Sequence, residues 1–202
     1  MSNTPVLFRA ENVSTALIGP VSLSLAAGEC VCLAGESGSG KSLLLRALAD
    51  LDPHTGKIML DSEEQQVIAA PVWRRQVAYL AAESHWWLPA VSDHFPHAGQ
   101  LDFTRLGFVN EVQSWPVARL SSGEKQRLAL LRALQFRPRV LLLDEITANV
   151  DPGNTLRVEA LVKDYLAAEQ AAAIWVSHEP EQIRRIATRQ LVIARGKLEQ
   201  AA

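Results

Sequence analysis

The chain has 202 residues, 48% of them hydrophobic and 21% charged, with a formal net charge of -2. This size and apolar content favour one compact domain, residues 1–202, with a proper buried core. The slight negative charge gives no general attraction to nucleic acid, and no segment approaches the roughly 18 apolar residues of a membrane span. Residues 1–14 lack the basic region and apolar stretch of a signal peptide, and the sequence holds only two cysteines, so we expect a cytosolic chain.

Apolar runs and turn residues predict the elements in the first half of the chain. Strands are expected at residues 5–13, 19–25, 29–35, 56–60 and 77–80, with a helix at 42–51. Cys30 and Cys32 lie on one face of the third strand, where small buried hydrophobes are the expected interpretation. The pattern from residue 83 to 116 is irregular and rich in Trp, His and Pro, which indicates a small, partly helical lobe.

The second half of the chain alternates helices and strands. A helix that begins near Ser121 is stopped by Pro138, so the lobe together with this helix covers residues 83–137. After it we expect a strand at 139–145, a helix from Asp151, a strand at 171–177, a helix from Pro180 and a strand at 190–194. Because these strands are apolar throughout, they indicate a parallel sheet buried on both faces, and therefore an α/β fold.

The segment GESGSGKS fits the phosphate-loop pattern G-x-x-x-x-G-K-[ST] at every position and lies between a predicted strand and a predicted helix. Its glycines let successive backbone N–H groups face one anion, and the helix adds its positive end. Lys41 supplies a charge to the β- and γ-phosphates, and Ser42 supplies a hydroxyl to Mg²⁺. The predicted nucleotide-binding residues here are Gly35, Glu36, Ser37, Gly38, Ser39, Gly40, Lys41 and Ser42.

Two further strand ends carry polar residues that would face the phosphate loop across one sheet edge. VLLLDE ends in two carboxylates, of which Asp144 is predicted to hold Mg²⁺ and Glu145 to orient and polarise the attacking water. Buried acids are costly unless they are paired or bind a metal, which favours this interpretation over a simple turn cap. His178 follows the strand at 171–177, and we expect it to contact the γ-phosphate and hold the same water. Glu145 and His178 are therefore the predicted catalytic residues.

A second glycine-containing helix start lies in LSSGEKQR. Ser121 and Glu124 have the spacing of a capping box, although Gly123 weakens the first turn by about 0.5–1 kcal/mol relative to alanine. Glycine leaves the backbone N–H groups accessible, and Ser121 and Ser122 add hydroxyls. The pattern predicts a second anion-binding helix end on the open side of the nucleotide site.

GESGSGKS, LSSGEKQRLALLRAL, VLLLDEITANVD and VSHE, in this order, resemble the ATP-binding subunits of ABC transporters, and the resemblance covers nearly the whole chain. It implies a phosphate-loop NTPase fold with a mostly parallel sheet, N-terminal antiparallel strands and a small helical lobe. It also implies ATP and Mg²⁺ as cofactors and ATP hydrolysis coupled to transport. In that family two copies form a head-to-tail dimer around two ATP molecules, so Gly123 would leave room for the partner copy's γ-phosphate.

The resemblance also assigns roles by position. It makes Asp144 the magnesium aspartate, Glu145 the catalytic glutamate and His178 the switch histidine. Asp151, in ANVD, matches a loop that crosses the dimer interface. Ser121, Gly123 and Glu124 match the family's signature, so the resemblance makes them nucleotide-binding residues.

The sequence departs from the family at three places. Ser122 replaces the first glycine of the usual signature pair. Ala82, beside Glu83, replaces a glutamine that in the family reaches the metal and senses the membrane partner. No clear aromatic residue for stacking on adenine is found near ENVSTAL, so selectivity for the base is expected to be loose.

The leading prediction is the energising ATPase of a transporter whose membrane-spanning subunit is another chain, bound peripherally at the cytoplasmic face of the inner membrane. GEKQRLALLRALQFRPRVLLLDEIT is similar to a bacterial branch described as iron exporters, which makes iron a candidate cargo. One alternative is a soluble ABC ATPase, for which the chain lacks a long coiled coil or a second such domain. Another is a weakly hydrolysing regulatory module, which Ala82 favours.

The aromatic segments HWW (85–87) and DHFPH (93–97) fit lobe packing and a partner surface better than a metal site, because metal ligands need converging geometry. Adjacent residues cannot both face inward well, so we expect Trp86 or Trp87 to be exposed. In the family that the sequence resembles, a short cytoplasmic helix of the spanning subunit docks in a groove beside this segment. With Leu88, the exposed ring is predicted to line that groove. The alternative is that both rings pack inside the lobe.

Overall fold

The computed structural model describes residues 6–200. The first strand, expected to begin at Pro5, and part of the expectation that no signal peptide is present fall on residues outside this range.

The strands form two sheets. An antiparallel sheet has the order β2-β1-β4-β5, with β1 at Val6–Ser14, β2 at Val21–Ala26, β4 at Thr55–Leu60 and β5 at Glu63–Glu64. The central sheet has the order β10-β9-β3-β8-β7-β6, with β3 at Cys30–Gly35, β6 at Val77–Leu80, β7 at Val140–Asp144, β8 at Ala172–Val176, β9 at Arg189–Ala194 and β10 at Lys197–Gln200. The central pairings are parallel except that of β10, which pairs antiparallel with β9 at one edge. The predicted fold, a mostly parallel sheet with N-terminal antiparallel strands, is confirmed.

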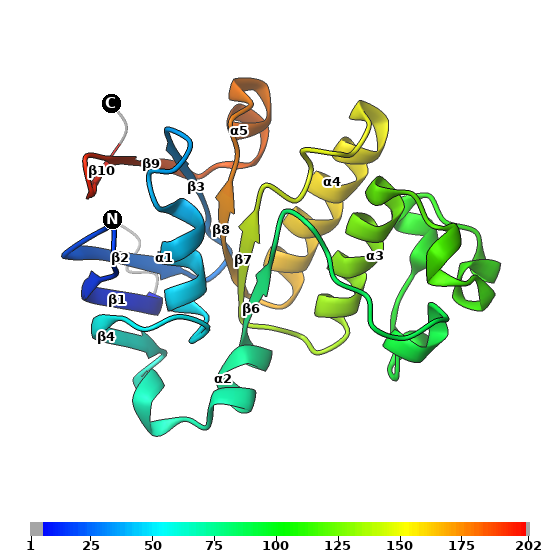
Figure 1. Cartoon of the computed structure of the whole chain (residues 1–202), viewed down its shortest axis with the longest axis horizontal. Helices are drawn as coiled ribbons and strands as arrows, with labels where there is room; N and C mark the ends of the chain where they lie inside the picture. The colour runs from blue at the N-terminus through cyan, green and yellow to red at the C-terminus, as the bar shows by residue number, and fades with distance from the viewer. Residues whose placement is uncertain (1–5, 201–202) are drawn as a thin grey trace.

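Helices cover both faces of the central sheet. The α-helices are α1 at Lys41–Leu48, α2 at Ala70–Gln76, α3 at Ser122–Leu134, α4 at Pro152–Ala168 and α5 at Pro180–Ile186. Figure 1 shows α1 between the central sheet and the antiparallel sheet, with α3 and α4 on the opposite side. The parallel strands are therefore enclosed, as their apolar sequences predict.

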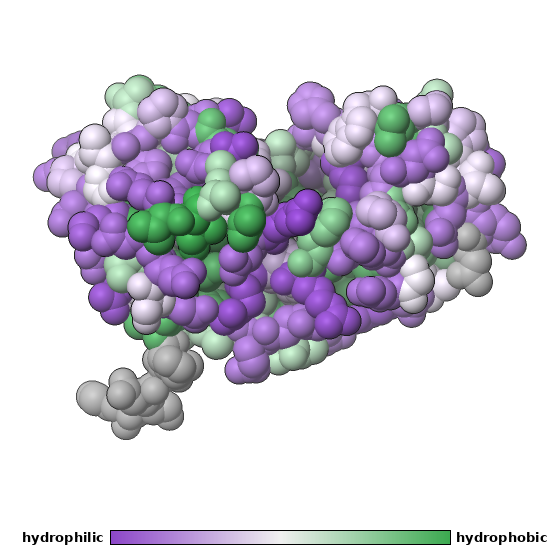
Figure 2. All heavy atoms as spheres, turned by 90° about the horizontal axis from the view of Figure 1, so that it is seen from below, coloured by the Kyte–Doolittle hydropathy of each residue, from purple (hydrophilic) through white to green (hydrophobic). Residues whose placement is uncertain are grey.

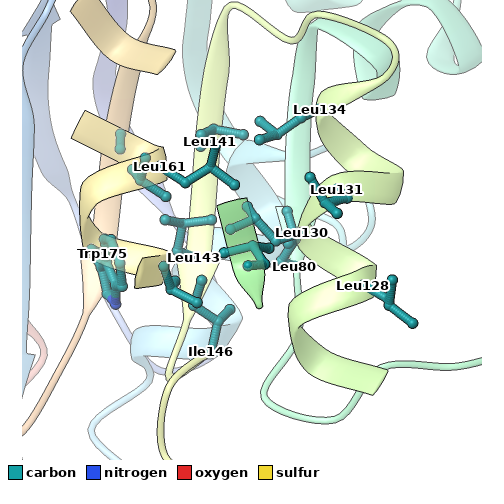
Figure 3. Close-up of a cluster of buried hydrophobic side chains, with 14 of the residues drawn as sticks. Leu80, Leu128, Leu130, Leu131, Leu134, Leu141, Leu143, Ile146, Leu161 and Trp175 are labelled. Carbon is teal, nitrogen blue, oxygen red and sulfur yellow. The ribbon is translucent and has the colours of Figure 1, made fainter. Parts of the chain in front are cut away.

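Alternate residues of each central strand belong to two separate hydrophobic clusters. Leu141, Leu143 and Trp175 belong to the cluster on the side of α3 and α4, and Figure 3 shows Leu130 and Leu134 of α3 directed toward the strands. Leu142 and Ile174 face α1 and the antiparallel sheet. The buried side chains on each face of the sheet thus pack into their own cluster. A shift of a strand by one residue would move its side chains to the wrong face, so this packing fixes the register of the strands. Cys30 and Cys32 are both buried in the first cluster, as small core residues.

The region predicted to form a lobe lies at one end of the molecule and is drawn in green in Figure 1. Apart from α3, its helical elements are short 3-10 turns: η2 at Ser92–His94, η3 at Ala98–Gln100, η4 at Phe103–Leu106, η5 at Asn110–Ser114 and η6 at Val117–Arg119. Phe95, Phe103 and Leu106 are buried there and join the first cluster, to which α3 also contributes. The division of the chain at residues 83 and 137 stays a prediction.

Several features differ from the sequence-based expectations. The helix expected at 42–51 ends at Leu48, because the backbone turns at Asp50, whose φ is +59°. The helix α2, which has Pro71 in its first turn, was not expected. Its seven residues are too few to show the repeating spacing of apolar residues that indicates a helix. The edge strand β10 was also missed, because its side chains are mostly exposed and carry no apolar run.

The surface of the protein is mixed. On the face seen in Figure 2, hydrophilic side chains predominate, and hydrophobic ones gather in a patch on the side of α2 and the 3-10 turn η1 (Gln65–Val67). Val67 and Val72, in these two elements, are exposed. None of the helices in residues 6–200 combines the length and the hydrophobicity that crossing a bilayer requires.

Candidate nucleotide-binding site

The phosphate loop joins the end of β3 to the start of α1, as its sequence predicts. Gly40 is the N-cap of α1, with a φ of +98° and no side-chain cap for the helix. A Cβ at this position would lie 2.7 Å from Cδ1 of Ile18, so only glycine fits both the backbone angle and the space. The first N–H groups of α1 are therefore left without a side-chain acceptor, which is the arrangement that binds an anion.

The polar side chains of the loop suit a polyphosphate. The Lys41 ammonium is buried and donates to the carbonyl oxygens of Gly35 and Glu36, each at 2.9 Å. The Ser39 hydroxyl is buried and has no hydrogen-bond partner within residues 6–200. A buried hydroxyl without a partner is costly, and a phosphate oxygen would satisfy it. Ser42, in the first turn of α1, is exposed.

Asp144 ends β7 on the same face of the sheet as α1. Its side chain is only 4% exposed, and its Oδ2 accepts a hydrogen bond of 2.9 Å from the Tyr79 hydroxyl on β6. Burial, and after it the nearby charge of Asp144, raises the pKa of Tyr79. The phenol therefore stays protonated and can donate a hydrogen bond. Sequence reasoning missed Tyr79, which looks like an ordinary aromatic residue within a strand.

A magnesium ion fits the donor set near Asp144. Within residues 6–200 there is no group of three or more His, Cys, Asp or Glu placed to hold a metal. Mg²⁺, however, usually takes one or two protein oxygens together with substrate phosphates and water. The Asp144 carboxylate and the Ser42 hydroxyl are donors of that kind, so both residues remain the predicted metal ligands.

Glu145 and His178 meet at the ends of β7 and β8. His178 Nε2 lies 3.0 Å from Glu145 Oε1, and both side chains are partly exposed. Glu145 has a φ of +52°, an uncommon value for a residue with a side chain. Such local strain is found most often at functional sites, where the surrounding structure holds it in place. Because β3, β8 and β7 are neighbours in the sheet, the phosphate loop, His178 and Glu145 follow adjacent strands at one edge.

The start of α3 is closed by its own side chains. Ser121 is the N-cap; its Oγ accepts from the Glu124 N–H at 3.2 Å, and Glu124 Oε2 accepts from the Ser121 N–H at 2.8 Å. The predicted capping box is confirmed. An added Cβ on Gly123 would lie 2.9 Å from the carbonyl oxygen of Asn149, so the helix start packs closely on the segment after Glu145. Within residues 6–200 no hydrogen bond joins residues 121–124 to the phosphate loop.

A second interaction fixes α3 to the sheet. Gln126 is buried, and its Nε2 donates to the carbonyl oxygen of Ala81 at 2.7 Å, directly after β6. This contact lies beside Ala82, the position where the predicted family has a glutamine. In the sequence Gln126 stands among the charged residues Lys125 and Arg127, so nothing local marks it as buried, and its acceptor is 45 residues away.

Asp151 lies at the other end of the segment that contacts Gly123. It is the N-cap of α4, and its Oδ1 accepts from the Asn154 N–H at 3.0 Å. Hydrogen bonds from Asn154, first from its side chain and then from its backbone, lower the pKa of Asp151.

Taken together, the fold and the three strand ends define a phosphate-loop nucleotide-binding protein. Residues 18–148 match the family described as ABC transporter, and this match covers more than half of the chain. The chain belongs to the ABC transporter family and is an ATP-binding domain of it.

Named relatives agree with this assignment. The chain is 33% identical over 199 residues to the probable iron export ATP-binding protein FetA of Escherichia coli (strain K12), covering 90% of this chain and 88% of FetA. It is 35% identical over 201 residues to the methionine import ATP-binding protein MetN of Brucella abortus (strain 2308), with 90% of this chain and 54% of MetN covered. It is 33% identical over 210 residues to the aliphatic sulfonates import ATP-binding protein SsuB of Granulibacter bethesdensis, covering 98% and 84%.

Proposed function

We propose that this chain hydrolyses ATP with Mg²⁺ and thereby powers a separate membrane-spanning permease, to which it binds at the cytoplasmic face of the inner membrane. The family supplies the coarser part, an ATP-binding transporter subunit of a kind that works with membrane permeases. The observation that carries the proposal is the 3.0 Å contact of His178 with Glu145, beside the phosphate loop on adjacent strands.

Each group has one task in the proposed mechanism. The N–H groups of residues 35–40 and the Lys41 ammonium bind and neutralise the β- and γ-phosphates. Ser42 and Asp144 would hold Mg²⁺, which would supply positive charge to the phosphates. Glu145 accepts a hydrogen bond from water and orients it for attack. His178 uses its N–H in turn, either to hold Glu145 in place or to donate to the transferred phosphoryl group.

The test of this function is the variant Glu145→Gln, which keeps the shape of the side chain and removes its charge. We expect ATP hydrolysis to fall on the order of 10²-fold or more, while ATP still binds. Glu63→Gln is the matched control, because Glu63 is an exposed carboxylate on β5 in the other sheet. Hydrolysis by Glu145→Gln at the parent rate would show that another group activates water.

We also propose that two copies assemble head to tail around two ATP molecules, each site using Ser121, Gly123 and Glu124 of the other copy. The N-terminus of α3 supports this, because Ser121 and Ser122 are exposed at a positive helix end. Glu145→Gln should accumulate as a dimer when ATP is added, as measured by light scattering. A Glu145→Gln protein that binds ATP and stays monomeric at all concentrations would contradict this assembly.

The proposed docking place of the permease is a groove of about 680 Å³ between α2, α3 and the segment after β6. Arg74, Arg75, Trp87 and Phe136 are among its lining residues. Trp87 is 69% exposed, whereas Trp86 packs against the core of the lobe, so one ring faces outward as the sequence predicts. A basic and aromatic groove suits a short helix with acidic and apolar side chains.

Truncation of the exposed ring tests this groove. Trp87→Ala should lower recovery of the complex with the co-expressed spanning subunit, since a buried aromatic anchor contributes about 2 kcal/mol or more. Basal ATPase activity and melting temperature should hold. Val109→Ala is the control, because Val109 is exposed elsewhere in the lobe region. Full recovery of the Trp87→Ala complex would place the docking surface elsewhere.

Iron is the cargo that we propose to test first. The match to FetA, a protein named for iron export, covers most of the length of FetA. MetN and SsuB are named for the import of methionine and of aliphatic sulfonates, so the test must compare iron export with uptake of these two cargoes. Deleting the gene should raise cellular iron if export is the function. Loss of methionine or sulfonate uptake in the same strain would favour those cargoes instead. A weakly hydrolysing regulatory module, favoured by Ala82, would show slow turnover even with the permease present.

A further inference from the structure

A buried tyrosine on the neighbouring strand holds the carboxylate of Asp144. The Tyr79 hydroxyl donates to Asp144 Oδ2 at 2.9 Å, across 65 positions of sequence. Within residues 6–200, Tyr79 is the one hydrogen-bond donor to this carboxylate, which is 4% exposed. A buried carboxylate with a single donor has one oxygen fixed and leaves its other oxygen, Oδ1, available for a cation.

The register of the sheet explains why a tyrosine does this. Tyr79 pairs with Leu142 in the parallel ladder of β6 and β7, so both side chains point to the α1 face. Asp144 lies two residues beyond Leu142 on the same face, a rise of about 6.6 Å along the strand. A tyrosine side chain can span that offset with its terminal oxygen. Phenylalanine would fill the same space but provide no donor.

We propose that Tyr79 is a positioning residue for metal binding, which orients Asp144 so that Oδ1 faces the ion held with the ATP phosphates. This inference rests on the proposed role of Asp144 as a magnesium ligand. Partners that hydrogen-bond to a ligating group orient it, and their loss typically weakens metal affinity about 10- to 100-fold.

The test measures how strongly Mg²⁺ assists ATP binding. All variants carry Glu145→Gln to stop turnover, and the dissociation constant of ATP is measured by calorimetry in Mg²⁺ and in EDTA. The Mg²⁺ effect is the dissociation constant of ATP in EDTA divided by that in Mg²⁺. We expect Tyr79→Phe to reduce this ratio about tenfold, while the dissociation constant in EDTA changes by less than about twofold. The unequal change is important, because a merely structural defect would weaken both bindings together.

Two control variants make the result decisive. Tyr165→Phe removes the hydroxyl of another half-buried tyrosine. That hydroxyl donates to the carbonyl oxygen of Pro138, at a distance of 2.7 Å and before the start of β7, so it lies far from the phosphate loop. This variant should leave the ratio of the dissociation constants unchanged. Asp144→Asn should abolish most of the Mg²⁺ effect.

The outcomes separate the inference from the function on which it rests. If Asp144→Asn loses the effect and Tyr79→Phe keeps it, the positioning role of Tyr79 is wrong and the metal role of Asp144 stands. If Asp144→Asn keeps the effect, Asp144 does not bind the metal, and both fail. A parallel loss in Mg²⁺ and EDTA, with a lower melting temperature for Tyr79→Phe, would assign Tyr79 a structural role only.

Discussion

The starts of α1 and α3 are both glycine-containing helix ends, yet they are built in opposite ways. Gly40 caps α1 without any side chain, whereas Ser121 and Glu124 close α3 with a complete capping box. The donors of α1 are thus left for a ligand, and those of α3 are partly satisfied by the chain itself. A glycine near a helix start therefore has two distinct uses. At residue 40 it gives the backbone a left-handed angle, and at residue 123 it allows close approach to Asn149.

The largest expected effect on ATP binding is at α1. Lys41→Ala should weaken ATP binding on the order of 10- to 100-fold, because a charge-assisted contact to phosphate is lost. The loop shape depends on glycines, so the melting temperature should change little. Lys57→Ala is the control, since Lys57 pairs with Glu64 on the antiparallel sheet. An unchanged dissociation constant for Lys41→Ala by calorimetry would mean that the backbone donors suffice.

The next effect distinguishes the two uses of Gly123. Gly123→Asp should lower ATPase activity about tenfold or more, because a carboxylate would repel the partner copy's phosphate. Gly123→Ala adds only a Cβ, 2.9 Å from the Asn149 carbonyl oxygen. If alanine costs as much as aspartate, packing within the chain explains the glycine. Gly99→Asp is the control, because a Cβ there meets nothing within 4 Å.

Mixing two defective proteins tests whether the second site belongs to another copy. Gly123→Asp has a sound phosphate loop, and Lys41→Ala has a sound α3 start, so a heterodimer holds at most one intact composite site. Activity of the mixture above that of either protein alone supports the head-to-tail assembly. A mixture that simply averages the two activities would argue that each nucleotide site is complete within one chain.

Much of this fold could be predicted because its signals are local. The phosphate loop and the apolar strands are contiguous segments, and the capping box spans only Ser121 to Glu124. The contacts that sequence reasoning missed join distant residues: Tyr79 with Asp144, Gln126 with Ala81, and Gly123 with Asn149. Each depends on strand register or helix placement, which no local pattern specifies. The roles of the site residues themselves stay predictions.

A smaller effect concerns the stability of the α3 start. Ser121→Ala removes the hydroxyl that accepts from the Glu124 N–H and should destabilise the protein by about 0.5–2 kcal/mol, seen as a lower melting temperature without ATP. The matched control is Ser122→Ala, because Ser122 lies inside the first turn and does not cap it. Equal melting temperatures for both variants would show that the Ser121 hydroxyl adds no measurable stability to the start of α3.

The smallest effect concerns α4, a third helix start that a titratable side chain caps. The hydrogen bonds from Asn154 lower the pKa of Asp151 in the folded chain below its unfolded value of about 3.9. Ionised Asp151 therefore stabilises the fold above that pH, and this contribution is lost as the pH falls through the lower, folded-state pKa.

Asp151→Asn keeps an amide cap but does not titrate, and asparagine caps helices about as well as aspartate does. The melting temperature of the parent should exceed that of Asp151→Asn at pH 7 by a small margin, and the margin should shrink below about pH 4. Measuring both proteins without ATP keeps any dimer interface out of the comparison. A margin that stays constant from pH 7 to the acid limit would mean that the charge of Asp151 does not stabilise α4, and that its cap is purely geometric, as Gly40 is for α1.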